Sequence, residues 1–145
     1  CLSGDYGIFS TYNETSDDGS AEGYAYIFNV TTGALLHTLR NPNPFGTANQ
    51  DRFGQYAAMD GNFAVIGAFA EDGLLGSSYG YAYIYDVTTG TLLHSIANPN
   101  DYDTPVSDQF GQAVSISGEY VIIGAPGEDE ANGTTSGKAY IFKGQ

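Results

Sequence analysis

A five-residue block recurs along this chain at a spacing of 57 residues. It reads Gly-Tyr-Ala-Tyr-Ile at 23–27 and 80–84, and Gly-Lys-Ala-Tyr-Ile at 137–141. Around the first two copies, residues 23–46 match residues 80–103 at 15 of 24 positions without a gap. A repeat of this length is a supersecondary unit that buries its faces only by stacking on its neighbours. The chain is therefore predicted to fold as a row of similar units.

A second block keeps the same spacing. Residues 51–72 match residues 108–129 at 10 of 22 positions, with Phe-Gly-Gln shared near the start and Ile-Gly-Ala near the end. Two blocks held in one register indicate a duplication. We treat the whole chain as one repeat array, with a partial first unit (1–50), a complete second unit (51–107) and a partial third unit (108–145).

The complete unit is predicted to form four antiparallel strands. Alternating apolar residues and the glycine-containing turns at Asp60-Gly61 and Thr88-Gly90 are typical of β-hairpins. Sustained helical periodicity is absent. The predicted strands cover residues 53–59, 63–69, 81–87 and 91–96.

The inner strands are apolar on both faces, which favours blades of a β-propeller, because each blade packs between two others. On the third strand of the first unit, Tyr24, Tyr26 and Phe28 point to one side. Ala25 and Ile27 point to the other, so that large and small faces of adjacent blades interdigitate. The prediction is an all-β, β-propeller-like chain of about two and a half blades. A stacked β-solenoid fits less well, because its coils are usually shorter than 57 residues.

The charge balance excludes some classes of function. Seventeen acidic residues face four basic ones, giving a formal net charge of −13. Such a surface repels phosphate backbones, so we expect no nucleic-acid partner.

No apolar run approaches the roughly 18 residues that span a bilayer. Cys1, the only cysteine, allows no intrachain disulfide. By the repeat it falls at the tail of a strand, which argues against a lipid anchor.

The units resemble the FG-GAP repeat family, in particular its short bacterial variety. The third unit carries Asp-Gln-Phe-Gly at 108–111, Gly-Ala-Pro at 124–126 and Gly-Lys-Ala-Tyr-Ile-Phe at 137–142. The resemblance covers essentially the whole chain and implies propeller blades like those of integrin α-chains and many secreted bacterial proteins. The location that it implies is extracellular or at the cell surface. Blades host many activities, so the resemblance says less about function.

The chain departs from the integrin-type pattern. That pattern places a calcium loop resembling Asp-x-Asp-x-Asp-Gly between the first two strands, where this chain has short turns at Ser3-Gly4, Asp60-Gly61 and Ser117-Gly118. Calcium takes six to eight oxygen ligands, and these turns supply too few. We therefore expect no integrin-like metal site and assign no cofactor.

Acidic residues that recur after the second strand leave calcium possible. They are Glu14, Glu71-Asp72 and Glu128-Asp129-Glu130. The alternative is a set of solvated loops, which we favour because the neighbouring ligand spacing varies. A further cluster, Asp101, Asp103 and Asp108, has an acidic repeat counterpart only at Asp51.

No catalytic site is expected. His37 and His94 share one strand position in consecutive units, which indicates packing or hydrogen bonding imposed by the blade. The chain also carries no nucleophile elbow and no zinc-ligand pairs. Asn13, Asn29 and Asn132 match the N-glycosylation pattern and are noted as possible decoration.

The sequence supports two hypotheses about function. The first is an extracellular structural or adhesive propeller module. By the repeat, the chain opens within a first strand and closes after a third strand, and two and a half blades close no ring. Neighbouring subunits or further repeats would complete it, in a homo-oligomer or a filament. The second is a propeller fragment of a larger secreted protein that binds a glycan or a protein with the help of calcium.

Overall fold

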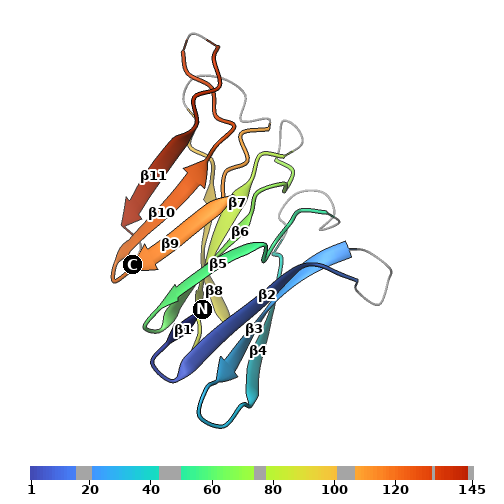
Figure 1. The fold of residues 1–145 in the computed structure, drawn as a ribbon, viewed down its shortest axis with the longest axis vertical. Helices are drawn as coiled ribbons and strands as arrows, with labels where there is room; N and C mark the ends of the chain where they lie inside the picture. The colour runs from blue at the N-terminus through green and yellow to red at the C-terminus, as the bar shows by residue number, and fades with distance from the viewer. Residues whose placement is uncertain (16–20, 43–49, 74–77, 101–106, 132, 144–145) are drawn as a thin grey trace.

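The chain folds into three antiparallel β-sheets and, in the described residues, no helix (Figure 1). The computed structural model describes all residues except 16–20, 43–49, 74–77, 101–106, 132 and 144–145. The first sheet comprises β1 (Leu2–Ser3), β2 (Tyr6–Thr15), β3 (Ala21–Asn29) and β4 (Leu35–Arg40). The second comprises β5 (Tyr56–Asp60), β6 (Phe63–Ala68), β7 (Tyr81–Asp86) and β8 (Thr91–Ala97). The third comprises β9 (Ala113–Ser117), β10 (Tyr120–Ala125) and β11 (Lys138–Lys143).

Each sheet is a meander whose strands pair in chain order. Figure 1 shows the sheets stacked face to face, with β5 beside β9 and β1 beside β5. The first strands of the units thus line one side of the stack, as the inner strands of propeller blades do. The predicted all-β, blade-like architecture is confirmed. None of the described segments is a helix of the length and apolarity that a membrane crossing needs.

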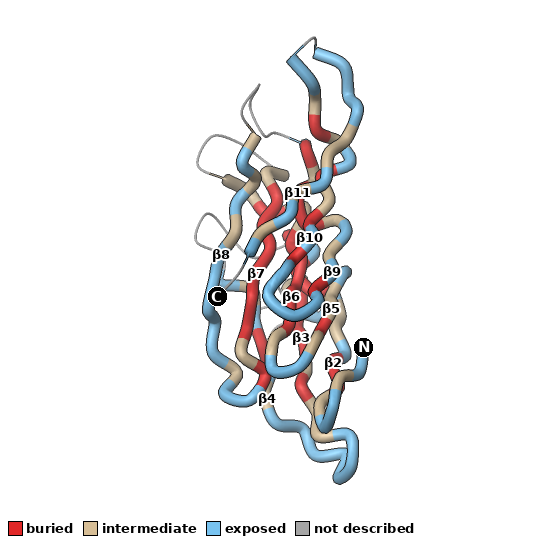
Figure 2. Tube along the Cα trace, turned by 90° about the vertical axis from the view of Figure 1, so that its left-hand side faces the viewer, coloured by how far each residue is buried: buried red, intermediate tan, exposed pale blue. Residues whose placement is uncertain are grey.

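Packing between the sheets follows the predicted alternation of large and small residues. Tyr83 and Tyr85 of β7 face the first sheet, where they meet Ala25 and Ile27 of β3. The small residues of β7, Ala82 among them, face the third sheet instead. The central strands of the second sheet, β6 and β7, are therefore buried on both faces, as their red tube in Figure 2 shows.

The boundaries of the strands differ from the prediction in two places. The first strand of the second unit begins at Tyr56 and not at residue 53, because the preceding residues turn away from the ladder, with Arg52 at φ 63° and Gly54 at φ 84°. The first hairpin is also centred one residue later than predicted. Asp60 pairs with Phe63, so the turn residues are Gly61 and Asn62. The other three strands of that unit end within one residue of their predicted limits.

The glycine of this turn has a conformational reason. Gly61 adopts φ 56°, and Gly4 and Gly118 adopt φ 55° and 54° at the same place in the other sheets. A positive φ at the first central residue is the requirement of a type II′ hairpin turn, which matches the twist of the strands. All three turns are two residues long, as the short turns in the sequence predict.

Candidate functional site at the blade interfaces

The phenylalanine of each Asp-x-Phe-Gly segment is buried where a sheet meets the preceding one. Phe53 and Phe110 are both 0% exposed. The ring centroid of Phe53 lies 6.0 Å from that of Tyr83, and the ring centroid of Phe110 lies 5.9 Å from that of Tyr140. Each phenylalanine belongs to the apolar cluster that its own sheet shares with the sheet before it. The phenylalanine of the motif therefore packs one sheet against the next.

The backbone of the Phe-Gly pair touches a glycine of the preceding sheet. A Cβ atom added to Gly23 would lie 1.7 Å from the carbonyl oxygen of Phe53. One added to Gly80 would lie 2.1 Å from the carbonyl oxygen of Phe110. Both distances are far below van der Waals contact, so only glycine fits at these positions. Gly23 and Gly80 are the first residues of the block whose recurrence reveals the repeat.

The glycine of Ile-Gly-Ala serves the same contact. A Cβ added to Gly67 would lie 2.0 Å from the carbonyl oxygen of Gly111 in the third sheet. The sequence predicts that the small residues at Gly67-Ala68 and Gly124-Ala125 relieve crowding near a central axis. At Gly67 the crowding comes from the Phe-Gly backbone that precedes β9, and crowding toward a central axis stays a prediction. In the third sheet, the three atoms nearest to a Cβ added at Gly124 all belong to its strand partner Ala113, the nearest at 3.3 Å.

The recurring glutamate accepts a hydrogen bond from a tyrosine of the third strand. It follows the second strand at Glu71 and Glu128, whereas Glu14 lies within β2 and not after it as predicted. Tyr83 Oη donates to Glu71 Oε1 at 2.5 Å, and Tyr26 Oη donates to Glu14 Oε2 at 2.7 Å. The third sheet repeats the pair with Tyr140 and Glu128, whose Oε1 also lies 2.8 Å from Lys138 Nζ. Glu71 and Glu128 thus hold the third strand to the loop, and Glu14 joins β3 to β2. Sequence reasoning missed the pairing, although glutamate and tyrosine recur 12 residues apart in all three units.

The aspartate that precedes Phe53-Gly54 or Phe110-Gly111 accepts a hydrogen bond from an asparagine that follows a fourth strand. Asn41 Nδ2 donates to Asp51 Oδ2 at 2.8 Å, and Asn98 Nδ2 donates to Asp108 Oδ2 at 2.8 Å. Asp51 and Asp108 are each 3% exposed. This hydrogen bond joins the two ends of the loop that leads from one blade into the next.

Burial changes the charge of the carboxyl groups at the first interface. Removal from water raises the pKa of Glu71 to about 8, against the lowering effect of the Tyr83 hydrogen bond. Burial, together with the nearby charge of Asp72, raises the pKa of Asp51 to about 7. A protonated Glu71 agrees with its Oε2 atom, which is buried and lacks a hydrogen-bond partner. The first interface therefore holds its buried Glu71 mainly as a neutral acid at pH 7.

This arrangement predicts a stability that falls as the pH rises. Between the ordinary pKa of Glu71 (4.5) and its folded value of about 8, the folded state binds more protons than the unfolded state. The stabilisation is complete below pH 4.5 and is lost as the pH passes through about 8. We expect the free energy of unfolding of the parent chain to fall by on the order of a few kcal/mol between pH 5 and 8.5. The Glu71→Gln variant cannot ionise at this position and should not show this fall. Urea unfolding across that range measures it.

The matched control is Glu119→Gln, because the Glu119 side chain is 62% exposed. It should keep the pH slope of the parent chain. A parent slope that Glu71→Gln leaves unchanged would show that Glu71 ionises in the folded protein as it does in the unfolded one.

The turns of adjacent sheets are also hydrogen-bonded to each other. Gly61 N donates to Ser3 Oγ at 2.8 Å, and Gly118 N donates to Asp60 Oδ2 at 2.7 Å. His37 Nε2 lies 3.2 Å from the carbonyl oxygen of Thr88 in the second sheet. His37 therefore makes the kind of hydrogen bond that its repeated position indicates. His94, its counterpart, is exposed in the second sheet.

The predicted glycosylation and acidic positions fall in different places. Asn13 is exposed near the end of β2. Asn29 accepts hydrogen bonds from Thr31 N and Thr32 N through its Oδ1 atom and so shapes the second hairpin turn. Asn132, Asp101 and Asp103 lie outside the described residues.

Within the part of the chain that the structure describes, no three histidine, cysteine or acidic side chains gather as a metal site does. Calcium binding stays a prediction. The described acidic residues at the interfaces have other roles, since Glu71 bonds to a tyrosine and Asp51 to an asparagine.

Comparison with protein families recognises two copies of the repeat. The FG-GAP repeat matches residues 45–85 and 100–142, which together exceed half of the chain. The chain belongs to the FG-GAP repeat family. Repeats of this family build propeller-type modules that are generally binding or structural and not catalytic, and they are typical of extracellular proteins. A search of curated proteins finds no match.

The outer face of the third FG-GAP blade is apolar and uncovered. Ile122 is 47% exposed, Ile141 68% and Tyr120 54%. The repeat counterparts of the two isoleucines in the second blade, Val65 and Ile84, are 0% and 2% exposed because the third blade covers them. The same surface is thus core in one blade and open in the next.

Proposed function

We propose that this chain is an extracellular structural or adhesive propeller module whose open blade faces are completed by neighbouring subunits or repeats. The assembly is a homo-oligomer or a filament. What carries the proposal is the contrast between Ile84, 2% exposed, and its counterpart Ile141, 68% exposed. A residue type that the fold uses as core in one blade is left in water in the next. Uncovered apolar faces of this kind mark interaction surfaces.

The first blade offers an apolar surface at the other end of the stack. Phe9 is 62% exposed, whereas its repeat counterpart Ile66 is 0% exposed. Two faces of different composition at opposite ends favour a head-to-tail contact. Such a contact gives a ring if the rotation closes and a filament if it does not. The net charge of −13 favours solubility of the chain as a whole.

Self-association tests this proposal. We expect the purified chain to show masses of at least two subunits in light scattering coupled to gel filtration, rising with concentration. Ile141→Lys places a charge in the open face and should shift the chain to monomer, since an unpaired charge in a contact strongly opposes it. Negative-stain images should show rings or fibres for the parent chain alone.

The control is Leu92→Lys, because Leu92 is 41% exposed on β8 and lies outside both core clusters. It should leave the mass unchanged. A parent chain that stays a sharp monomer at all concentrations, with neither rings nor fibres in the images, would rule out self-assembly.

A further inference from the structure

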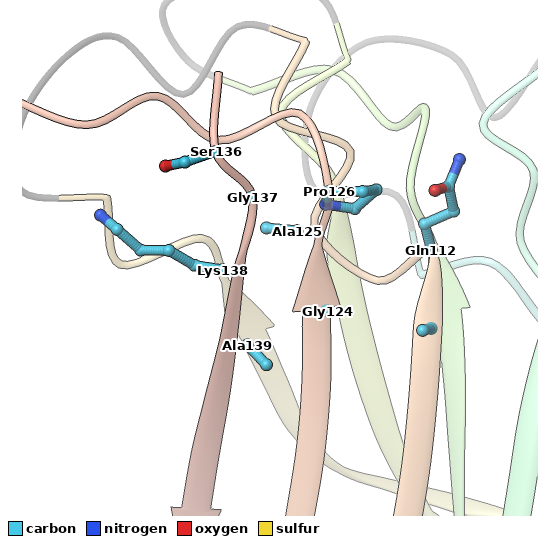
Figure 3. A pocket seen from close by; sticks show the side chains of 9 residues that line it. Gln112, Gly124, Ala125, Pro126, Ser136, Gly137, Lys138 and Ala139 are labelled. Atoms are coloured by element: carbon cyan, nitrogen blue, oxygen red, sulfur yellow. The ribbon is translucent and has the colours of Figure 1, made fainter. Parts of the chain in front are cut away.

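A pocket of about 430 Å³ opens on the third blade where β10 and β11 meet the adjoining loops (Figure 3). Its lining includes Gly124, Ala125, Gly137, Lys138 and Ala139. Figure 3 shows the small residues of β10 and β11 bordering an open space, with the Lys138 side chain at one side. A wall made of glycine and alanine leaves the strand backbone accessible.

The counterparts of these residues in the second blade are already occupied. Counted back by 57 residues, Gly124 and Gly137 correspond to Gly67 and Gly80. The latter two lie against the carbonyl oxygens of Gly111 and Phe110, at 2.0 and 2.1 Å from an added Cβ. Ala82, the counterpart of Ala139, is 0% exposed beneath the same segment.

The first blade receives a Phe-Gly pair in the same way. A Cβ on Gly23 would meet the carbonyl oxygen of Phe53 at 1.7 Å, and one on Gly54 would meet the carbonyl oxygen of Tyr24 at 2.8 Å. One contact is therefore made twice in this molecule, at equivalent positions of two blades. The third blade presents the same surface, and no Phe-Gly pair of the described residues lies on it.

We propose that the pocket between Gly124 and Gly137 binds the Asp-x-Phe-Gly-Gln segment of a further FG-GAP blade. The inference rests on the proposed function, because it names what covers one of the open faces. The occupant is a further blade and not the Phe-Gly segments of a second folded copy. Phe53 and Phe110 are 0% exposed, so a second copy has both of its own segments already buried.

The charge around the pocket suits the aspartate of the incoming segment. In the first interface, Glu22 of the preceding blade raises the pKa of Asp51 by repulsion. The position of Glu22, one residue before Gly23, is held in the third blade by Ser136, which also lines the pocket. Lys138, two residues after Ser136, holds the repeat position of Tyr24 and Tyr81. Lys138 is ion-paired with Glu128 at 2.8 Å, so the incoming carboxylate gains a hydroxyl at the position where Asp51 meets an acid.

The probe is a fluorescently labelled peptide of residues 107–117, Ser-Asp-Gln-Phe-Gly-Gln-Ala-Val-Ser-Ile-Ser. We expect saturable binding to the full chain in fluorescence anisotropy. The same peptide with Phe110→Ala should bind at least about tenfold more weakly, because a buried aromatic anchor contributes more than 1.4 kcal/mol. The chain variant Ala139→Arg should weaken binding by a similar factor. Ala139 is exposed, so this change leaves the fold intact.

Ser95→Arg is the matched control, since it adds the same charge at an exposed position of β8 outside the pocket. It should bind the peptide as the parent chain does. Equal binding of the two peptides, no saturation, or full binding to Ala139→Arg would overturn the proposal. Light scattering without peptide is read on the same samples. A chain that assembles but does not bind the peptide keeps the proposed function and loses this inference. A monomer that binds the peptide loses self-assembly but keeps completion of the open face by a further repeat.

Discussion

Replacing Phe110 by alanine is expected to lower the free energy of unfolding by about 3–5 kcal/mol, the range for large-to-small changes at buried aromatic residues. Phe110 is 0% exposed and packs against Tyr140 and Phe142 as well as the second blade. Its loss leaves a cavity at the interface itself. The third blade should therefore loosen first, so hydrogen exchange should accelerate in β9, β10 and β11 before it does in β7.

Phe9→Ala provides the comparison, because it deletes the same atoms from a residue that is 62% exposed. In the monomeric Ile141→Lys background it should change stability by less than about 0.5 kcal/mol. Equal losses for the two variants, or a Phe110→Ala chain with unchanged exchange in β9–β11, would contradict the role of Phe110 as the fastener between blades. Urea unfolding and exchange followed by mass spectrometry give both readings.

The blade architecture was predictable from sequence because one repeat supplied several consistent signals. The recurring Gly-Tyr-Ala-Tyr-Ile block placed the third strand, and the alternation along it separated the large face from the small one. Alternation has a period of two, so a shift by one residue would have exposed the whole core face. That constraint explains why β6, β7 and β8 end within one residue of the predicted limits.

The sequence was less informative about the start of the first strand and about the roles of single residues. Arg52 and Gly54 adopt positive φ, which the alternating pattern around them conceals. The hydrogen bond from Tyr83 to Glu71 joins groups 12 residues apart across a loop, and neither local propensity nor periodicity reports such a contact. Comparison of the units was the only signal available, since both residues recur together.

The three units also show how one position changes with its surroundings. Glu71 and Glu128 are both 0% exposed and both accept from a tyrosine. Beside Glu128 stands Lys138, which forms an ion pair at 2.8 Å, whereas the second unit has Tyr81 there. The second blade therefore buries its carboxyl with no ammonium in the place of Lys138, whereas the third blade buries one in an ion pair. The proton-linked loss of stability that Glu71 predicts should accordingly arise at the first interface.

Gly80→Ala is expected to lower the free energy of unfolding by at least about 3 kcal/mol. Two causes contribute, and substitutions at two other glycines of the chain measure them separately. Gly80 has φ 80°, and its added Cβ would lie 2.1 Å from the carbonyl oxygen of Phe110. Gly33 has φ 71° with nothing within 4 Å, so Gly33→Ala measures backbone strain alone, about 1 kcal/mol. Gly23 has no positive φ but an added Cβ at 1.7 Å from the Phe53 oxygen, so Gly23→Ala measures close approach alone.

The three losses of unfolding free energy, ranked by size, show whether these glycines are needed because the Phe-Gly backbone approaches them closely. Gly23→Ala and Gly80→Ala should both exceed Gly33→Ala by about 2 kcal/mol or more, because forced overpacking costs about 1–3 kcal/mol and here the obstacle is backbone. Similar losses in all three would mean that the turn conformation matters and the contact does not. Exchange mapping adds a second criterion, since Gly80→Ala should release the third blade, and Gly23→Ala should open the interface between the first two.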